Sequence, residues 1–105
     1  MNTHKQILMM MMNNKEKLIK KVNEIKALIQ DQIVMIQSNP ELQFAVDHLN
    51  KIDVDMNNIL VDLDFLEDLN YHDLIVLTRH CQRGMENFEI LKMTVTFYLM
   101  SQREI

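Results

Sequence analysis

Apolar residues recur along this chain in steps of three and four, the spacing that places them on one face of an α-helix. In the first third of the sequence the resulting stripe is interrupted only by a glutamine, and it predicts a helix over about residues 14–37. The stripe consists of Leu18, Val22, Ile25, Ile29, Gln32 and Ile36, widened by Ile19 and Ile33.

The segment Ser38–Glu41 predicts the end of this helix and the start of the next. Pro40 suits the first position of a helix, where its missing N–H costs nothing, and it disfavours helical geometry at Asn39. The side chain of Asn39 is therefore expected to cap the second helix. The stripe then resumes without a miss and predicts a helix over about residues 40–68. Its positions are Leu42, Ala45, Leu49, Ile52, Met56, Ile59, Leu63 and Leu66.

A second break is predicted at Asp68–Asp73. Asn70 can either end the second helix in left-handed geometry or cap a third, with Asp73 in a place resembling a capping box. The third helix is predicted over about residues 71–101. Its stripe contains Gly84, which marks either a close helix approach or a weak point that costs about 1 kcal/mol against alanine. The stripe positions are Leu74, Leu77, Cys81, Gly84, Phe88, Leu91, Val95 and Tyr98.

Three long helices joined by short connections predict an all-α fold, an antiparallel up-down-up bundle. The composition agrees, because one Gly and one Pro in 105 residues leave little material for the tight turns of a β-protein. We expect a single domain over residues 13–105. Residues 1–12, with four consecutive methionines at Met9–Met12, are expected to form a flexible Met-rich N-terminal arm.

The predicted third helix carries a second apolar stripe on the face away from its core stripe. A helix that is apolar on both faces must be covered on both, and contiguous exposed apolar patches tend to mark interfaces. We therefore expect a partner-binding surface here, which either completes the bundle as a homodimer or binds another protein. Its residues are Ile90, Met93, Phe97 and Met100, with Val61 and Phe65 of the second helix expected nearby.

Charge is distributed unevenly, although the net charge is only −4. Six lysines lie between Lys5 and Lys26, whereas the segment from Ile52 to Thr78 has seven acids and no Lys or Arg. One interpretation is that the basic first helix packs along the acidic second helix. The alternative is a dimeric nucleic-acid-binding regulator that uses the Lys-rich first helix, although its lysines do not line one face cleanly. They are Lys15, Lys17, Lys20, Lys21 and Lys26.

Residues Asp53–Asp64 resemble the spacing of an EF-hand calcium loop at Asp53, Asp55 and Asn57. The resemblance fails at Asn58, where the sharp turn of the loop calls for Gly, and at Asp64, where a Glu would bind calcium through both oxygens. The unbroken apolar stripe through this segment favours a continuous helix.

Candidate chemistry is otherwise absent from the sequence, and we predict neither a catalytic residue nor a metal or cofactor. No two of the four histidines are spaced three or four apart, and one glycine cannot form a phosphate-binding loop. A single cysteine excludes an intramolecular disulfide, and no apolar run approaches the roughly 20 residues of a membrane span. We expect a non-enzymatic, cytoplasmic protein–protein interaction module, such as a small helical adaptor, inhibitor or chaperone-like regulator.

Overall fold

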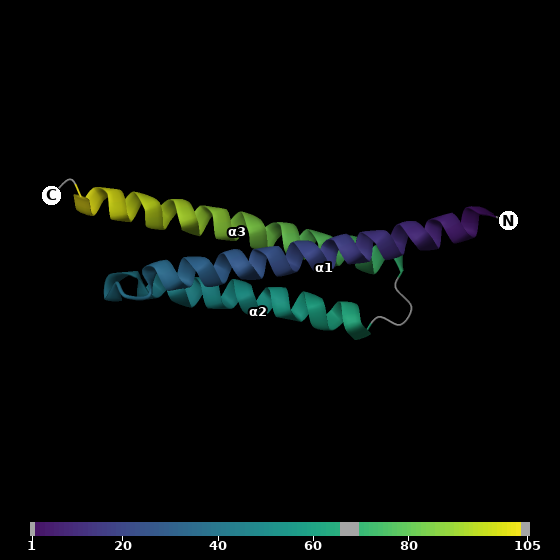
Figure 1. The fold of residues 1–105 in the computed structure, drawn as a ribbon, viewed down its shortest axis with the longest axis horizontal. Helices are drawn as coiled ribbons and strands as arrows, with labels where there is room; N and C mark the ends of the chain where they lie inside the picture. The colour runs from purple at the N-terminus through teal and green to yellow at the C-terminus, as the bar shows by residue number, and fades with distance from the viewer. Residues whose placement is uncertain (1, 66–69, 104–105) are drawn as a thin grey trace.

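The computed structural model describes residues 2–65 and 70–103 of the chain. These residues form three α-helices, α1 (Asn2–Ile36), α2 (Gln43–Phe65) and α3 (Tyr71–Arg103), and one short 3-10 helix, η1 (Pro40–Leu42). Figure 1 shows that α2 runs antiparallel to α1 and α3, which are parallel to each other. The prediction of an all-α, up-down-up arrangement of three packed helices is therefore confirmed, whereas dimerisation stays a prediction.

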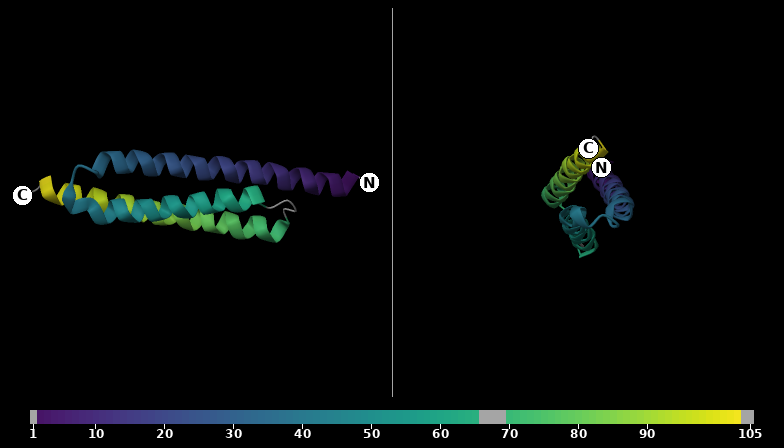
Figure 2. Two further views of the ribbon diagram at one scale, coloured as in Figure 1. Left: turned by 90° about the horizontal axis from the view of Figure 1, so that it is seen from below. Right: turned by 90° about the vertical axis from the view of Figure 1, so that its left-hand side faces the viewer.

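The three helices form a rod whose extents are 69 × 22 × 18 Å. Seen end-on, they occupy the corners of a triangle (Figure 2). The N-terminal part of α1 extends beyond the start of α3, and at the opposite end of the rod α3 diverges from α1 (Figure 1).

The core lies on the long axis of the rod, where the predicted stripes face one another. Every described stripe position of α1 and α2 is buried, whereas Leu66 lies outside the described residues. Gln32 is the polar member of the stripe and is 9% exposed. Burying one such aliphatic side chain contributes about 1.5–3 kcal/mol, so this core is the main source of stability. Ten of its side chains are under 2% exposed: Val22, Ile25, Ile29, Ile36, Leu42, Ala45, Leu49, Met56, Leu63 and Val95.

The core becomes thinner toward the C-terminal end of α3. Leu74, Leu77, Cys81, Gly84, Phe88 and Val95 are buried as predicted, whereas Leu91 and Tyr98 are only half-buried. Because α3 diverges from α1 in this region, those two stripe positions are packed on fewer sides.

Helix α1 begins at Asn2, well before the predicted start near Asn14. Asn13 and Asn14 do not interrupt it, because the methionines that precede them are good helix formers. The Met run is therefore helical, and Met9, Met10 and Met12 are exposed. The flexibility expected of residues 1–12 stays a prediction. At the other boundary, α2 is described to Phe65, so its predicted end near residue 68 lies outside the described residues.

The connection from α1 to α2 differs in one detail from the sequence prediction. Asn39 does occupy the N-cap position with extended geometry (φ −101°, ψ 103°), and Pro40 follows at the first helical position. In the described structure, however, the Asn39 side chain makes no capping hydrogen bond. The first turn is a 3-10 turn, in which the backbone N–H of Leu42 donates to the Asn39 carbonyl at 3.0 Å. The acceptor at this helix start is therefore the Asn39 backbone carbonyl and not its side chain.

Asn70 caps α3, which selects one of the two predicted alternatives. The backbone N–H of Asp73 donates to Asn70 Oδ1 at 2.8 Å, and the N–H of Leu74 donates to the Asn70 carbonyl at 3.2 Å. No non-glycine residue in the described ranges has a positive φ, so the left-handed alternative is not adopted. The side-chain bond satisfies one of the donors left free in the first turn of α3.

Candidate interaction surfaces

The second apolar stripe of α3 lies on the outside of the bundle. Its four members follow one another in steps of three and four and therefore share one face of the helix. More than half of each side chain is exposed: Ile90 63%, Met93 58%, Phe97 65% and Met100 52%. The exposure that a binding surface requires is thus present, while the binding role of these residues stays a prediction.

Val61 and Phe65 are exposed, but the structure does not bring them close to this stripe. Gly84 of α3 lies against Met56 of α2, which fixes the register of these two antiparallel helices. From that contact, Val61 lies farther toward the start of α3, whereas Ile90 lies toward its end. At 1.5 Å per residue the two are separated by roughly 16 Å or more along the bundle. That Val61 and Phe65 form one surface with the stripe stays a prediction, and the register of the helices places Val61 and Ile90 at different levels of the bundle.

A groove of about 850 Å³ runs between α1 and α3, and no residue of α2 lines it. Leu18, Leu74 and Cys81 form its buried floor, and Ile75 and Met85 are half-buried in its walls. The sequence alone did not indicate this groove. Apolar periodicity assigned the floor residues to the core, but it carries no information on how completely two parallel helices close over them.

Most of the charges on the rim of this groove are positive. Lys17 and Lys21 line it from α1, and Arg79 and Glu86 line it from α3. Lys26, in contrast, contacts α2. The lysines of α1 thus lie on different sides of the helix, so they do not present one basic stripe. Nucleic-acid binding by this helix stays a prediction without support from the arrangement.

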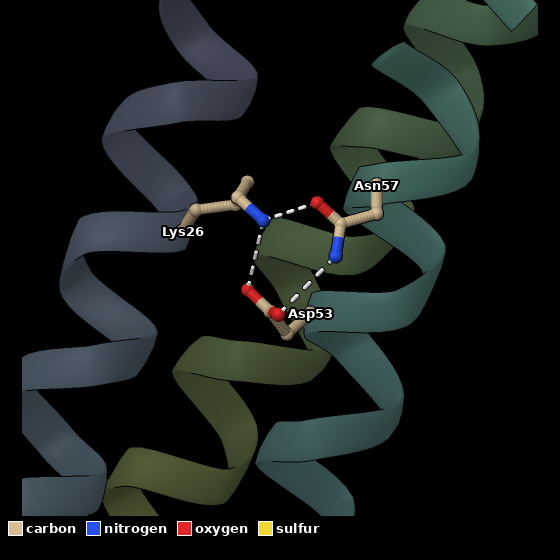
Figure 3. A network of polar contacts seen from close by, with 3 residues as sticks. All are labelled: Lys26, Asp53 and Asn57. Atoms are coloured by element: carbon tan, nitrogen blue, oxygen red, sulfur yellow. Dashed lines mark hydrogen bonds and ion pairs between the residues drawn. The ribbon is translucent and has the colours of Figure 1, made fainter. Parts of the chain in front are cut away.

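The packing of α1 against α2 includes one small polar network, which Figure 3 shows. Lys26 Nζ lies 3.4 Å from Asp53 Oδ1 and donates a hydrogen bond to Asn57 Oδ1. Asn57 Nδ2 in turn donates to Asp53 Oδ2 at 3.4 Å. The Lys26–Asp53 contact is an ion pair rather than an aligned hydrogen bond, because Asp53 Oδ1 has no hydrogen-bond donor among the described residues. This pair provides the predicted meeting of opposite charges between the first two helices.

The same network bears on the segment that resembles a calcium loop. Residues 53–64 are continuous helix within α2, as the apolar stripe predicted. Asp53 and Asn57 point toward α1, whereas Asp55 lines a second groove on the other flank of the helix. Side chains on opposite flanks of one helix cannot surround a single ion as the residues of a loop do.

The second groove lies between α2 and α3, has a volume of about 380 Å³ and is lined mainly by polar and charged residues. Asp55 and Asp62 line it from α2, opposite His80 and Arg83 of α3. Opposite charges therefore face each other across this seam as well. Across the described part of the chain, His, Cys, Asp and Glu side chains form no group of three that could hold a metal ion.

Cys81 is buried in the floor of the α1/α3 groove. Burial raises the pKa of its thiol, and the positive charge of Lys21 opposes this rise only in part. The thiol is therefore protonated at neutral pH and is a poor nucleophile. We interpret Cys81 as a small apolar core residue.

Comparison of the chain with known protein families, curated proteins and solved structures finds no match. Within residues 2–65 and 70–103, no helix is both long and apolar enough to cross a membrane. The exposed surfaces themselves are therefore the basis on which a function can be inferred.

Proposed function

We propose that this chain is a non-enzymatic protein–protein interaction module that binds through the outer face of α3. One observation carries the proposal: four large apolar side chains, each more than half exposed, lie consecutively on one face of a helix. Single exposed apolar residues are ordinary on protein surfaces, but a contiguous patch of this kind is typical of an interface. Phe97 is the largest of the four and lies within the row, as an aromatic anchor of an interface does.

The energetics of such a contact support a functional role. At about 25 cal/mol per Å² of apolar surface, burying three or four of these side chains contributes several kcal/mol before the costs of association. Two of the four are methionines, whose flexible side chains adapt to the surface of a partner. A module of this kind acts by occupying or linking other proteins, as an adaptor, inhibitor or chaperone-like regulator does.

Site-specific photo-crosslinking tests the proposal with no assumption about which protein the partner is. A photoreactive amino acid is placed at Phe97 in one version of the full chain and at Lys51, an exposed polar position of α2, in another. After irradiation in the cells that produce the chain, we expect a discrete protein adduct from position 97 and none from position 51. The proposal is overturned if position 97 gives no adduct beyond the background of position 51.

A further inference from the structure

The side of the bundle away from α2 is called here the α1/α3 face. Its apolar residues extend beyond the groove. Lys21 lines the groove, and Leu28 and Met35 follow it at intervals of seven, which places them in the same row of α1. Glu86 lines the groove from α3, and Met93 and Met100 follow it in the same way. All four of these apolar side chains are exposed. Beyond the groove, exposed apolar side chains therefore continue along both helices toward their C-terminal ends.

Charge changes sign along this face. On α1 one row reads Lys17, Glu24, Asp31, again at intervals of seven, and on α3 Arg79 is followed by Glu86 in the next turns. Because α1 and α3 are parallel (Figure 1), the basic residues of both helices gather at one end of the face and the acidic residues lie farther along it. At these positions the face is basic at its N-terminal end and acidic in its middle, with Lys92, seven residues after groove-lining Met85, as a basic exception.

We infer that the α1/α3 face binds the same face of a second copy of this chain, antiparallel about a two-fold axis. In that orientation the basic end of each copy lies against the acidic segment of the other, whereas a parallel pairing would place like charges together. The face carries both a basic segment and an acidic segment, which can pair with each other between two copies. A surface that binds an unrelated partner does not need both. A two-fold interface of this type uses one patch twice and closes as a dimer.

The shape of the groove fits the same arrangement. The antiparallel orientation carries Met93 of one copy toward the open end of the groove in the other, beside Tyr71 and Leu74. Unbranched methionine side chains can fill an irregular groove of this kind. The inference rests on the proposed function and specifies its occupant, because Met93 and Met100 belong to both surfaces.

Charge reversal tests the inference on the full chain. The double variant Lys21→Glu/Arg79→Glu makes the basic end acidic, and both residues are exposed, so the core is untouched. We expect the unmodified chain to form a dimer in light scattering over a dilution series, with a dissociation constant that rises with salt. The double variant should dissociate at least about tenfold more readily, since like charges then face each other. Circular dichroism serves as the control for folding.

The quadruple variant, which adds Glu24→Lys and Glu86→Lys, reverses one basic and one acidic residue on each of the two helices and keeps the net charge at −4. In an antiparallel dimer opposite charges meet again, so this variant should recover dimerisation close to that of the unmodified chain. Recovery at unchanged net charge separates specific pairing from general repulsion. The inference is overturned if the unmodified chain is monomeric at all concentrations, or if the double variant dimerises as well as the unmodified chain does.

Cross-linking then reports the orientation. In a Cys81→Ala background, Gln82→Cys places a thiol between the basic and acidic zones, close to the proposed two-fold axis. A short bis-maleimide should join two such chains, whereas Met100→Cys, near one end of the face, should not be joined to its own copy. Joining of the Met100→Cys chains alone would indicate a different pairing and overturn the inference. A photo-adduct from position 97 to another protein, found together with a monomeric chain, would leave the proposed function intact.

Discussion

The methyl end of the Met56 side chain lies in the space that a Cβ atom on Gly84 would occupy. The next nearest neighbour on another residue, Ile52 Cγ2, would lie 3.8 Å from such an atom, which is ordinary contact. The single glycine of the chain therefore marks a close approach of α2 and α3, one of the two interpretations that the sequence left open. Only the tip of one flexible side chain stands in the way of a larger residue.

Substitutions at Gly84 should consequently depend strongly on size. Gly84→Ala gains about 1 kcal/mol of helix propensity, offset by the displacement of the Met56 methyl group, so we expect a change in the free energy of unfolding of less than about 1 kcal/mol. Gly84→Leu overfills the contact and should destabilise the bundle by about 1–3 kcal/mol. Urea denaturation measures both, and Met56→Ala should reduce the cost of the leucine. Equal stability of the leucine variant and the unmodified chain would contradict the close approach.

Phe97→Asp should abolish assembly through the outer face of α3 while leaving the helix content unchanged. The substitution places a charge where an apolar surface would be buried, and the side chain takes no part in the core. Asn87→Asp is the matched control, because Asn87 is exposed on the same helix but lies on the flank that lines the groove beside α2. Light scattering gives the mass and circular dichroism the helix content. Assembly of the Phe97→Asp variant at unmodified strength would mean that another surface is used.

Stability should fall in alkaline solution in a way that depends on Cys81. Burial raises the pKa of this thiol above its ordinary value of 9.0. The unfolded chain therefore releases the proton at a lower pH than the folded chain does. The contribution of the buried protonated thiol to the free energy of unfolding is complete below pH 9.0 and is lost as the pH rises toward the folded pKa. Comparing urea denaturation of the unmodified chain and Cys81→Ala cancels the titration of other groups. The difference between them should shrink above pH 9, and a difference independent of pH would contradict the expectation.

Removing the cap of α3 should lower stability by about 1 kcal/mol. Asn70→Ala deletes the acceptor that binds the backbone N–H of Asp73, and losses of this kind typically cost about 0.5–2 kcal/mol. Asn70→Asp keeps an acceptor and should retain most of the stability. Asn58→Ala, an exposed position inside α2, is the control and should be neutral or slightly stabilising. Thermal unfolding followed by circular dichroism measures all three variants, and the same melting temperature for each would mean that the cap does not stabilise α3.

The sequence contained nearly all the information needed to predict the core. The steps of three and four from Leu18 to Ile36 identified the buried face of α1, including Gln32, because helical periodicity is a local property. Asn70 was likewise recognisable as a cap from its own neighbours. The start of α1 was misplaced because two asparagines were given more weight than the helix propensity of the methionines before them.

Features that depend on how helices lie against one another were not predictable in this way. Val61 and Ile90 both face outward, but their separation follows from the register fixed at Gly84 and Met56. The α1/α3 groove follows from the parallel packing of two helices that are not adjacent in sequence. Neither register nor groove is encoded in the spacing of residues along a single helix.

The divergence of α3 from α1 also has a consequence for hydrogen exchange. Beyond Phe88, Val95 is the one fully buried side chain in the described part of α3, so the last turns of this helix are anchored by few apolar contacts. Local opening there requires far less free energy than global unfolding, and its backbone amides should exchange with deuterium sooner than those of the helix middle. An exposed apolar surface of the molecule thus lies on a weakly anchored helix end. A partner that binds this surface would slow amide exchange there, and exchange rates would map the contact residue by residue.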